Sequence, residues 1–298
     1  MKNLILLLLT TFTVVSSQAA LVYVPSRFRA QQAKLVVVIH GCLQSPEVMA
    51  FGAGWNQLAE QNQFLVLYPE VPQGTHPLGC WGWYLPENQR KDSGQLKMIM
   101  DEIKSVKKTY QLKNPEVYLT GVSSGGATVA GLMACFPKDF KAGAIHSGGS
   151  YGLVQDMASA EKLMKEGPPE ATTKGPCKPQ DYKGAVFVIH GNQDPVVNMK
   201  NAERILLDFA GPMKDPGKKE VREGYTITDV PGVSGIRRGR LVMVEGLGHA
   251  WSGSTDNLKH SQMLGPQGKF PTVIPFFSEK GPNATQMMWD FFQEVSKK

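Results

Sequence analysis

The chain has 298 residues, of which 42% are hydrophobic and 19% are charged, and it contains 31 Gly and 20 Pro. This composition is typical of a folded globular protein and excludes a disordered, collagen-like or coiled-coil chain. The formal net charge of +6 includes Lys2 and is concentrated in residues 211–240, where Tyr225 is the only aromatic residue. A nucleic-acid surface combines basic with stacking aromatic side chains, so we expect no nucleic-acid partner.

The N-terminus has the pattern of a secretory signal peptide. Lys2 precedes an apolar stretch from Leu4 to Val15, and small residues at Ser17 and Ala19 fit a cleavage site. We therefore expect a signal peptide over residues 1–19, with cleavage after Ala20 as the alternative, and a single mature domain over 20–298. No later apolar run reaches 18 residues, which predicts no membrane-spanning segment and a periplasmic or secreted location.

Short apolar runs rich in β-branched residues alternate with segments of helical period along the mature chain. Strands are expected at residues 35–39, 64–68, 116–120, 142–146, 185–190 and 240–245. Helices are expected at 55–61, 93–110 (capped by Ser93), 126–136, 199–209 and 284–295 (begun by Pro282 and Asn283). Strands so continuously apolar are buried on both faces. The alternation predicts an α/β fold with a doubly wound, mostly parallel sheet, helices on both faces and no large lid domain.

Two segments, 151–181 and 211–239, lack clear periodicity. The second is expected to contain an antiparallel hairpin near 231–235.

The sequence GVSSG at 121–125 matches the GxSxG motif in the setting that gives it meaning. The run EVYLT before it predicts a strand, and GATVAGLMACF after it predicts a helix. A tight turn between them would raise the Ser123 hydroxyl above the sheet as a nucleophile. A second match, GGSYG at 148–152, has no helix behind it, so Ser150 is interpreted as loop structure.

A nucleophilic serine needs a base and an acid that orients the base. Asp194 follows the expected strand 185–190, and His249 follows the strand 240–245. Because parallel strands end at one edge of the sheet, Ser123, Asp194 and His249 are predicted to meet there as a catalytic triad. Asp181, ahead of its strand, and Asp208, inside a helix, are the weaker candidates for the acid.

The remaining histidines have other interpretations. His146 and His190 end apolar strands and are read as hydrogen-bonded groups under the site, while His76 and His260 lie in loops, and no metal site is expected. His40 and Gly41 follow the first strong strand, where a turn can donate backbone N–H groups to an oxyanion. The predicted donors are the N–H groups of Cys42 and of Ser124.

Four cysteines in an exported chain suggest two disulfides. None belongs to a CxxC pair, so a zinc or redox motif has no support. Of the three connectivities we favour Cys42–Cys80 with Cys135–Cys177, because Cys42 and Cys80 each follow an early strand.

A linked set of motifs resembles the poly(3-hydroxybutyrate) depolymerase family of esterases, which also includes feruloyl and acetylxylan esterases. The motifs are HGCLQS at 40–45, GWNQLAEQNQFLVLYPE at 54–70, CWGWY at 80–84, GVSSGGA at 121–127, HGNQD at 190–194, GLGHAWSG at 246–253 and GPNATQMMWDFF at 281–292. The resemblance implies an α/β-hydrolase fold and a carboxylic-ester hydrolase that uses Ser123, Asp194 and His249 without a cofactor. This sequence shows no Thr-rich linker and no appended binding domain like those of polymer-degrading members. We therefore do not expect it to act on crystalline polymer as those members do.

Substrate contacts are expected from the loop tryptophans Trp81, Trp83 and Trp251, with plain packing as the alternative. Trp83 and Trp251 are the favoured contacts, and Trp81, next to the expected disulfide, is the more structural member. An apolar cleft with few polar anchors would suit short hydroxyacid esters such as poly(3-hydroxybutyrate) or its oligomers. Feruloyl or acetylxylan ester hydrolysis is the main alternative function. A serine peptidase of the same fold and a non-catalytic binding protein are the others.

Overall fold

The computed structural model describes residues 20–32, 34–170, 172–212, 219–231, 237–254 and 276–297. Within these residues the main sheet has nine strands in the order β1-β3-β2-β4-β5-β6-β9-β8-β7. They are β1 (Leu21–Tyr23), β2 (Leu35–Ile39), β3 (Leu65–Tyr68), β4 (Val117–Val122), β5 (Ala142–His146), β6 (Ala185–Gly191), β7 (Lys219–Arg222), β8 (Tyr225–Pro231) and β9 (Arg237–Val244). Neighbouring strands are parallel in the central part of the sheet, β3-β2-β4-β5-β6-β9. The edge strands β1, β8 and β7 pair antiparallel.

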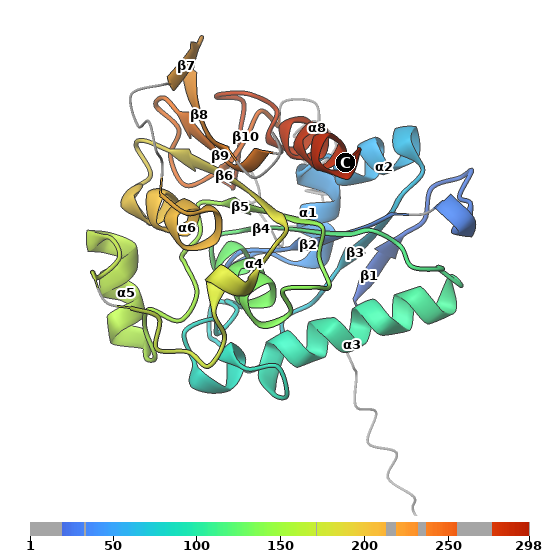
Figure 1. Ribbon diagram of the computed structural model, residues 1–298, viewed down its shortest axis with the longest axis horizontal. Coiled ribbons are helices and arrows are strands. Elements are labelled where there is room, and N and C mark those ends of the chain that lie inside the picture. The colour runs from blue at the N-terminus through green and yellow to red at the C-terminus, as the bar shows by residue number, and fades with distance from the viewer. Residues whose placement is uncertain are drawn as a thin grey trace, which may run out of the picture.

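Helices cover both faces of this sheet (Figure 1). One face packs against α3 (Gly94–Thr109), α4 (Ser124–Cys135) and α6 (Lys200–Ala210). The other face packs against α1 (Pro46–Gly52), α2 (Trp55–Asn62) and α8 (Ala284–Ser296). This is the doubly wound α/β arrangement predicted from the sequence.

Smaller elements lie outside the two helix layers. Helix α5 (Met157–Glu166) packs in a separate apolar cluster with Trp83 and Tyr84, and it lies at the left of Figure 1. The other small elements are the 3-10 turns Ala30–Gln32, Pro86–Gln89 and Pro179–Asp181, and the parallel pair β10 (Trp251–Ser252) and β11 (Phe277–Ser278).

Local chemistry explains where several elements form. All five residues of β2, the sequence LVVVI, are buried, as expected for an apolar strand covered on both sides. Asn283 caps α8 by accepting the Gln286 N–H at 2.9 Å, as predicted. Ser93 precedes α3 as predicted, but its hydroxyl does not cap the helix: it donates to the Glu87 carbonyl at 2.9 Å.

The expected strands and helices are all present, with ends shifted by up to three residues. Helix α5 falls in the segment 151–181 that lacks clear periodicity. Its buried side chains are Ala160 and Leu163, and the helix was not predicted from the sequence. β8 and β9 form the expected antiparallel hairpin, and residues 232–236 between them lie outside the described part.

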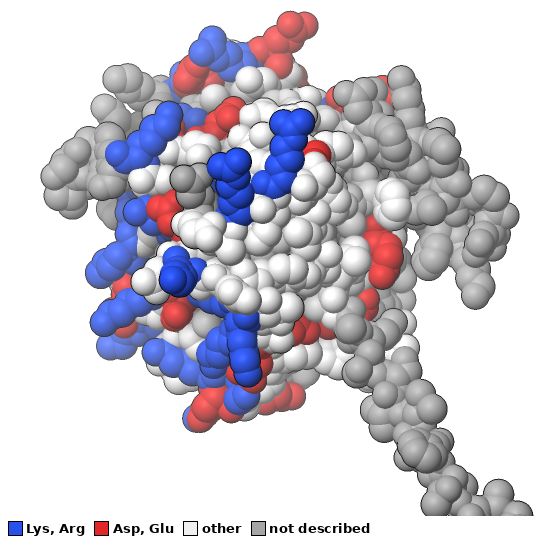
Figure 2. All heavy atoms as spheres, turned by 90° about the vertical axis from the view of Figure 1, so that its right-hand side faces the viewer, with Lys and Arg blue, Asp and Glu red and all other residues white. Residues whose placement is uncertain are grey.

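Basic side chains do not form a continuous field on the face drawn in Figure 2. Lys and Arg gather along one side of that face with Asp and Glu among them, beside a broad uncharged area. On α3, for example, Asp101 pairs with both Lys97 and Lys104. Within the described residues, no helix has the length and apolar character needed to cross a membrane.

Candidate active site

Ser123 occupies a sharp turn between β4 and α4. Its φ of 56° and ψ of −122° lie outside the usual regions for a residue with a side chain, a conformation that persists only where the surroundings enforce it. The glycines of the motif allow backbone segments to approach each other closely at this turn. A Cβ at Gly121 would lie 2.6 Å from the Gly125 carbonyl oxygen, and one at Gly125 would lie 2.3 Å from the His40 carbonyl oxygen. The GxSxG spacing is therefore a steric requirement of this turn.

Asp194 and His249 meet at the carboxyl ends of β6 and β9. His249 Nδ1 donates to Asp194 Oδ2 at 2.8 Å, while Oδ1 of the same carboxylate accepts the N–H groups of Val196 and Val197 at 2.9 Å each. Burial acts to raise the pKa of Asp194, but the hydrogen bonds from His249 and from the Val197 N–H outweigh it and hold that pKa at about 2. The carboxylate is thus ionised at neutral pH and acts only as an acceptor.

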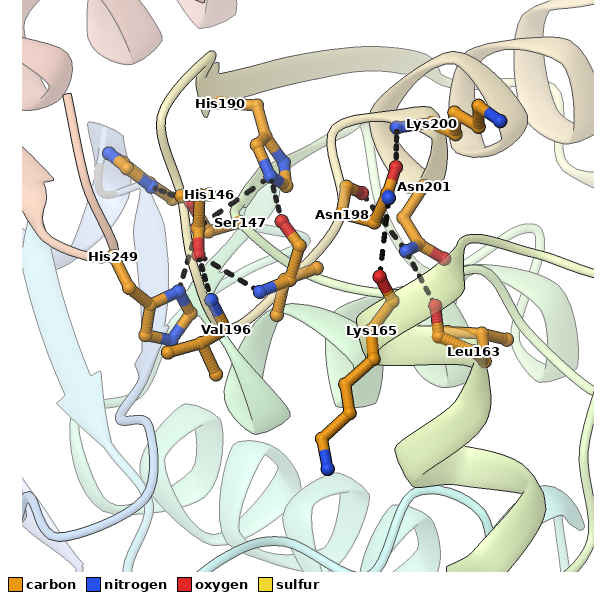
Figure 3. Close-up of polar contacts among 12 residues, drawn as sticks. His146, Ser147, Leu163, Lys165, His190, Val196, Asn198, Lys200, Asn201 and His249 are labelled. Carbon is orange, nitrogen blue, oxygen red and sulfur yellow. Dashed lines mark hydrogen bonds and ion pairs between the residues drawn. The ribbon is translucent and has the colours of Figure 1, made fainter. Parts of the chain in front are cut away.

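Two further histidines, His146 and His190, lie buried beside this pair (Figure 3). His190 Nε2 lies 2.8 Å from the Val197 carbonyl oxygen and 3.6 Å from Asp194 Oδ2. Since a carbonyl only accepts, Nε2 carries the proton. His190 Nδ1 has no hydrogen-bond partner among the described residues, so the expectation of a fully hydrogen-bonded His190 is wrong for that atom.

Burial lowers the pKa of both histidines, that of His146 to about 3. At neutral pH the His146 and His190 imidazoles beside Asp194 are therefore uncharged.

The turn that holds Asp194 also binds helix α5 (Figure 3). The Asn198 N–H donates to the Met164 carbonyl at 2.7 Å, and its side-chain amide donates to the Lys165 carbonyl at 3.3 Å. Asn201 Nδ2 donates to the Leu163 carbonyl at 3.0 Å. Asn198 thus satisfies the Met164 and Lys165 carbonyls at the end of α5, and Asn201 adds a second bond to the Leu163 carbonyl, which also accepts the Gly167 N–H at 3.1 Å. These bonds tie α5 to the acid-bearing turn.

Ser123 and His249 line the same cleft, which has a volume of about 340 Å³. Most of its walls are apolar, and α5 supplies one of them. The lining includes Leu43, Leu78, Trp81, Trp83, Tyr84, Val122, Met157, Ala160, Met164, Val196 and Phe276. Among the described residues, the polar side chains that line the cleft besides Ser123 and His249 are those of Gln44, His76, Ser124 and Glu161. Such a cleft favours an uncharged, largely apolar substrate.

The two predicted oxyanion donors, Cys42 and Ser124, also line the cleft. Ser124 is the first residue of α4, where N–H groups have no partner inside the helix. Around Cys42, the Gly41 N–H donates to Gln44 Oε1 at 2.6 Å and the Leu43 N–H donates to the Leu78 carbonyl at 2.7 Å. A Cβ at Gly41 would lie 3.2 Å from Ser123 Cβ, so a small residue lets this loop approach the serine.

Comparison with known protein families gives a match to the family described as "Esterase PHB depolymerase" over residues 18–217. That range includes Ser123 and Asp194 and covers more than half of the chain. The chain belongs to this family.

Individual relatives agree with this assignment. A poly(3-hydroxyalkanoate) depolymerase C from Paucimonas lemoignei is 25% identical over 76% of this chain and 57% of its own length. An acetylxylan esterase A from Aspergillus oryzae is 26% identical over 64% of this chain and 65% of its own length. The chain thus spans about three fifths of the length of these relatives.

The fold also agrees with solved structures. An acetyl xylan esterase from Aspergillus awamori superposes with a TM-score of 0.63 at 21% identity, over 77% of this chain and 88% of that one. With the sheet described above, this likeness places the chain among α/β-hydrolases.

The three predicted substrate tryptophans lie in different surroundings in this PHB depolymerase family member. Trp83 lines the cleft with 9% of its surface exposed, and Trp81 lines it while fully buried. Trp251 does not line the cleft. It is 1% exposed, its ring stacks on His146 at a centroid distance of 5.1 Å, and its Nε1 donates to Thr285 Oγ1 at 3.1 Å. The expectation that Trp251 contacts substrate is wrong, because β10 directs this side chain into the core.

The alternative nucleophile and one of the two alternative acids have structural partners. Ser150 is 1% exposed and donates to Asp208 Oδ2 at 2.6 Å, and Asp208 pairs with Arg204 at 2.9 Å. Asp181 is exposed in a 3-10 turn. None of these residues lines the cleft, which agrees with the interpretation of Ser150 as loop structure.

Sequence reasoning missed the α5 wall and His76. Met157, Ala160, Glu161 and Met164 line the cleft, and their spacing of three, four and seven residues is a helical signal that identifies this face in retrospect. His76 also lines the cleft, with its Nδ1 accepting the Leu78 N–H at 3.1 Å, whereas His260 lies outside the described residues.

The structure contains the two favoured disulfides, Cys42–Cys80 and Cys135–Cys177. Among the described residues, no group of three or more His, Cys, Asp or Glu side chains is arranged to hold a metal ion.

Proposed function

We propose that this chain is an exported serine carboxylesterase that hydrolyses esters of short hydroxyacids, poly(3-hydroxybutyrate) or its oligomers, through an acyl-enzyme. The observation that carries the proposal is the Asp194–His249 hydrogen bond of 2.8 Å beside a strained, cleft-lining Ser123. Family membership supports the same reaction class.

Acylation begins with attack of Ser123 Oγ on the ester carbonyl carbon. Ionised Asp194 accepts a hydrogen bond from the Nδ1–H of His249. The proton stays on Nδ1, so Nε2 carries a lone pair and can take the Ser123 proton. The carbonyl oxygen becomes an oxyanion that accepts hydrogen bonds from the Cys42 and Ser124 N–H groups. When the tetrahedral intermediate collapses, the ester C–O bond breaks and His249 returns the proton to the leaving alcohol.

Deacylation repeats these steps with water. His249 takes a proton from a water molecule as its oxygen attacks the acyl carbon. The bond to Ser123 Oγ then breaks, the proton returns to Oγ, and a free acid leaves.

The apolar walls support a short aliphatic hydroxyacid ester as substrate. Met157, Met164 and Leu78 offer contacts to methyl and methylene groups, and Trp83 offers an apolar face. Acetylxylan or feruloyl ester hydrolysis is the second candidate, because an acetylxylan esterase and a feruloyl esterase are among the relatives that match the chain.

Three substrates compared at equal enzyme concentration test the proposal: amorphous poly(3-hydroxybutyrate), methyl ferulate and acetylated xylan. We expect fastest acid release from the polyester. Faster release from xylan or ferulate would favour the second candidate. Hydrolysis of an aminoacyl-nitroanilide in preference to p-nitrophenyl butyrate would instead indicate a peptidase, and turnover of none of these substrates would indicate a binding protein.

A further inference from the structure

The two disulfides of this chain have different surroundings. Cys42 and Cys80 both line the catalytic cleft. Cys135 is the last residue of α4 and is fully buried in the core, and neither it nor Cys177 lines the cleft. The loops closed by the two bridges are similar in length, with sequence separations of 38 and 42 residues. Because the entropic effect of a disulfide on the unfolded chain depends on loop length, the bridges should stabilise the fold by similar amounts.

The loop that contains Cys42 has few anchors of its own. Leu43 has a φ of 62° and leaves 56% of its surface exposed, so its side chain does not pack the loop into the core. The Gly41 N–H is bonded within the loop, to Gln44. The backbone bond to another segment is the one from the Leu43 N–H to the Leu78 carbonyl, at 2.7 Å.

The disulfide joins the loop to the same segment, 78–81, which is anchored at its C-terminal end by Trp81. Trp81 is fully buried, and its backbone N–H lies 3.4 Å from Ser124 Oγ, at the first residue of α4. Cys42 Sγ itself lies 3.5 Å from Ser124 Oγ. Cys42, Cys80, Trp81 and Ser124 thus form a closed chain of covalent and polar contacts, which includes both residues whose N–H groups are predicted to bind the oxyanion.

We propose that the Cys42–Cys80 disulfide is a positioning element for the oxyanion site, holding the Cys42 N–H at a set distance from the Ser124 N–H. The inference rests on the proposed esterase function. An oxyanion donor acts through its position, and loss of one donor typically slows turnover by about a hundredfold or more. Opening this bridge should leave Ser123, His249 and the cleft walls in place while it releases the Cys42 donor. The effect should therefore fall on kcat more than on KM.

Two double variants test the proposal. Cys42→Ala/Cys80→Ala keeps both backbone amides and removes the cleft bridge, and Cys135→Ala/Cys177→Ala is the matched control. We expect the cleft variant to lose tenfold or more in kcat for p-nitrophenyl butyrate, with KM within about threefold of wild type. The control should keep kcat near wild type, although its thermal midpoint falls by at least as much.

A boronic acid inhibitor gives a second measurement that stability alone would not change. Its tetrahedral adduct with Ser123 places an oxygen at the oxyanion position, so its Ki should rise with the loss in kcat only in the cleft variant. Equal kcat losses in both double variants, or an unchanged kcat and Ki in the cleft variant, would overturn the positioning role. A wild-type protein that is inactive on every ester would instead overturn the proposed esterase function on which this inference rests.

If the cleft variant does not fold, partial reduction of the wild type decides the question. Samples taken during a dithiothreitol titration are assayed and then alkylated, and mass spectrometry shows which bridge has opened. We expect kcat to fall in step with opening of Cys42–Cys80. A kcat that persists after this bridge is open would overturn the proposal.

Discussion

The choice between the two GxSxG matches is decided at the level of single side chains. Ser123 is held in a strained turn at the cleft, whereas Ser150 is buried against Asp208. We expect Ser123→Ala to lower kcat by several powers of ten with little change in thermal midpoint.

Ser150→Ala should instead keep turnover and lose about 1–3 kcal/mol of stability, because Asp208 loses a buried partner. Ester turnover and thermal unfolding of the two variants provide the measurements. An inactive Ser150→Ala beside an active Ser123→Ala would show that the wrong motif has been chosen.

His146 should make stability depend on pH. Burial lowers its pKa from 6.5 to about 3 in the folded chain. Between these two values the unfolded chain binds a proton that the folded chain does not, so stability falls as the pH falls through this window, by about 1.4 kcal/mol per pH unit for this group.

Glu70 and Glu102, whose pKa values burial raises to about 7, have the opposite effect on the total. The test is therefore the difference between wild type and His146→Gln in urea unfolding at pH 6, 5 and 4. We expect wild type to lose stability relative to the variant at each step down, and a pH-independent difference would contradict this.

At the scale of elements, α5 shapes the substrate cleft. Met157 and Met164 project from it into the cleft, while Asn198 and Asn201 bind its C-terminal end. We expect Met157→Ala/Met164→Ala to lower kcat/KM for a 3-hydroxybutyrate trimer about tenfold, because buried methionine contacts to the longer substrate are lost. The kcat/KM for p-nitrophenyl acetate should stay within about twofold, since this small ester leaves most of the cleft empty.

Lys162→Ala is the matched control on the same helix. Lys162 does not line the cleft and pairs with Glu166 at 3.8 Å. Its replacement should alter neither substrate's kcat/KM. A loss of the same size in Lys162→Ala would mean that α5 affects catalysis through its stability and not through its methionines.

At the scale of the whole molecule, export remains a proposal that the two disulfides support, because such bridges persist in oxidising compartments. We expect the mature protein, expressed with its own N-terminus in a Gram-negative host, to begin at Ala20. N-terminal sequencing of periplasmic and medium fractions gives the answer. Retention of Lys2 in the purified protein would contradict the signal-peptide assignment.

We also propose that residues 20–298 form one catalytic domain. The expected result is a single calorimetric transition whose van't Hoff and calorimetric enthalpies agree. Two separable transitions would show that the chain is divided.

The sequence by itself was sufficient to place the central strands along the chain and to propose the candidate triad. Continuous apolar runs such as β2 predict strands without reference to any distant residue. Since parallel strands end at one edge of a sheet, polar residues that follow them, Asp194 and His249, could be expected to meet. The disulfide pairing followed from the same reasoning.

The tertiary structure alone decided which side chains form the cleft. Trp251 looked like a substrate contact because it follows His249 by two residues, but its pairing in β10 and its stacking on His146 bury it. The wall formed by α5 depends on contacts between segments 30 or more residues apart. The position of His190 beside Asp194 depends on the turn that closes over the end of the strand. Periodicity reports only whether a residue faces a core. Which neighbour it meets there is set by how the layers pack, and no local pattern encodes that choice.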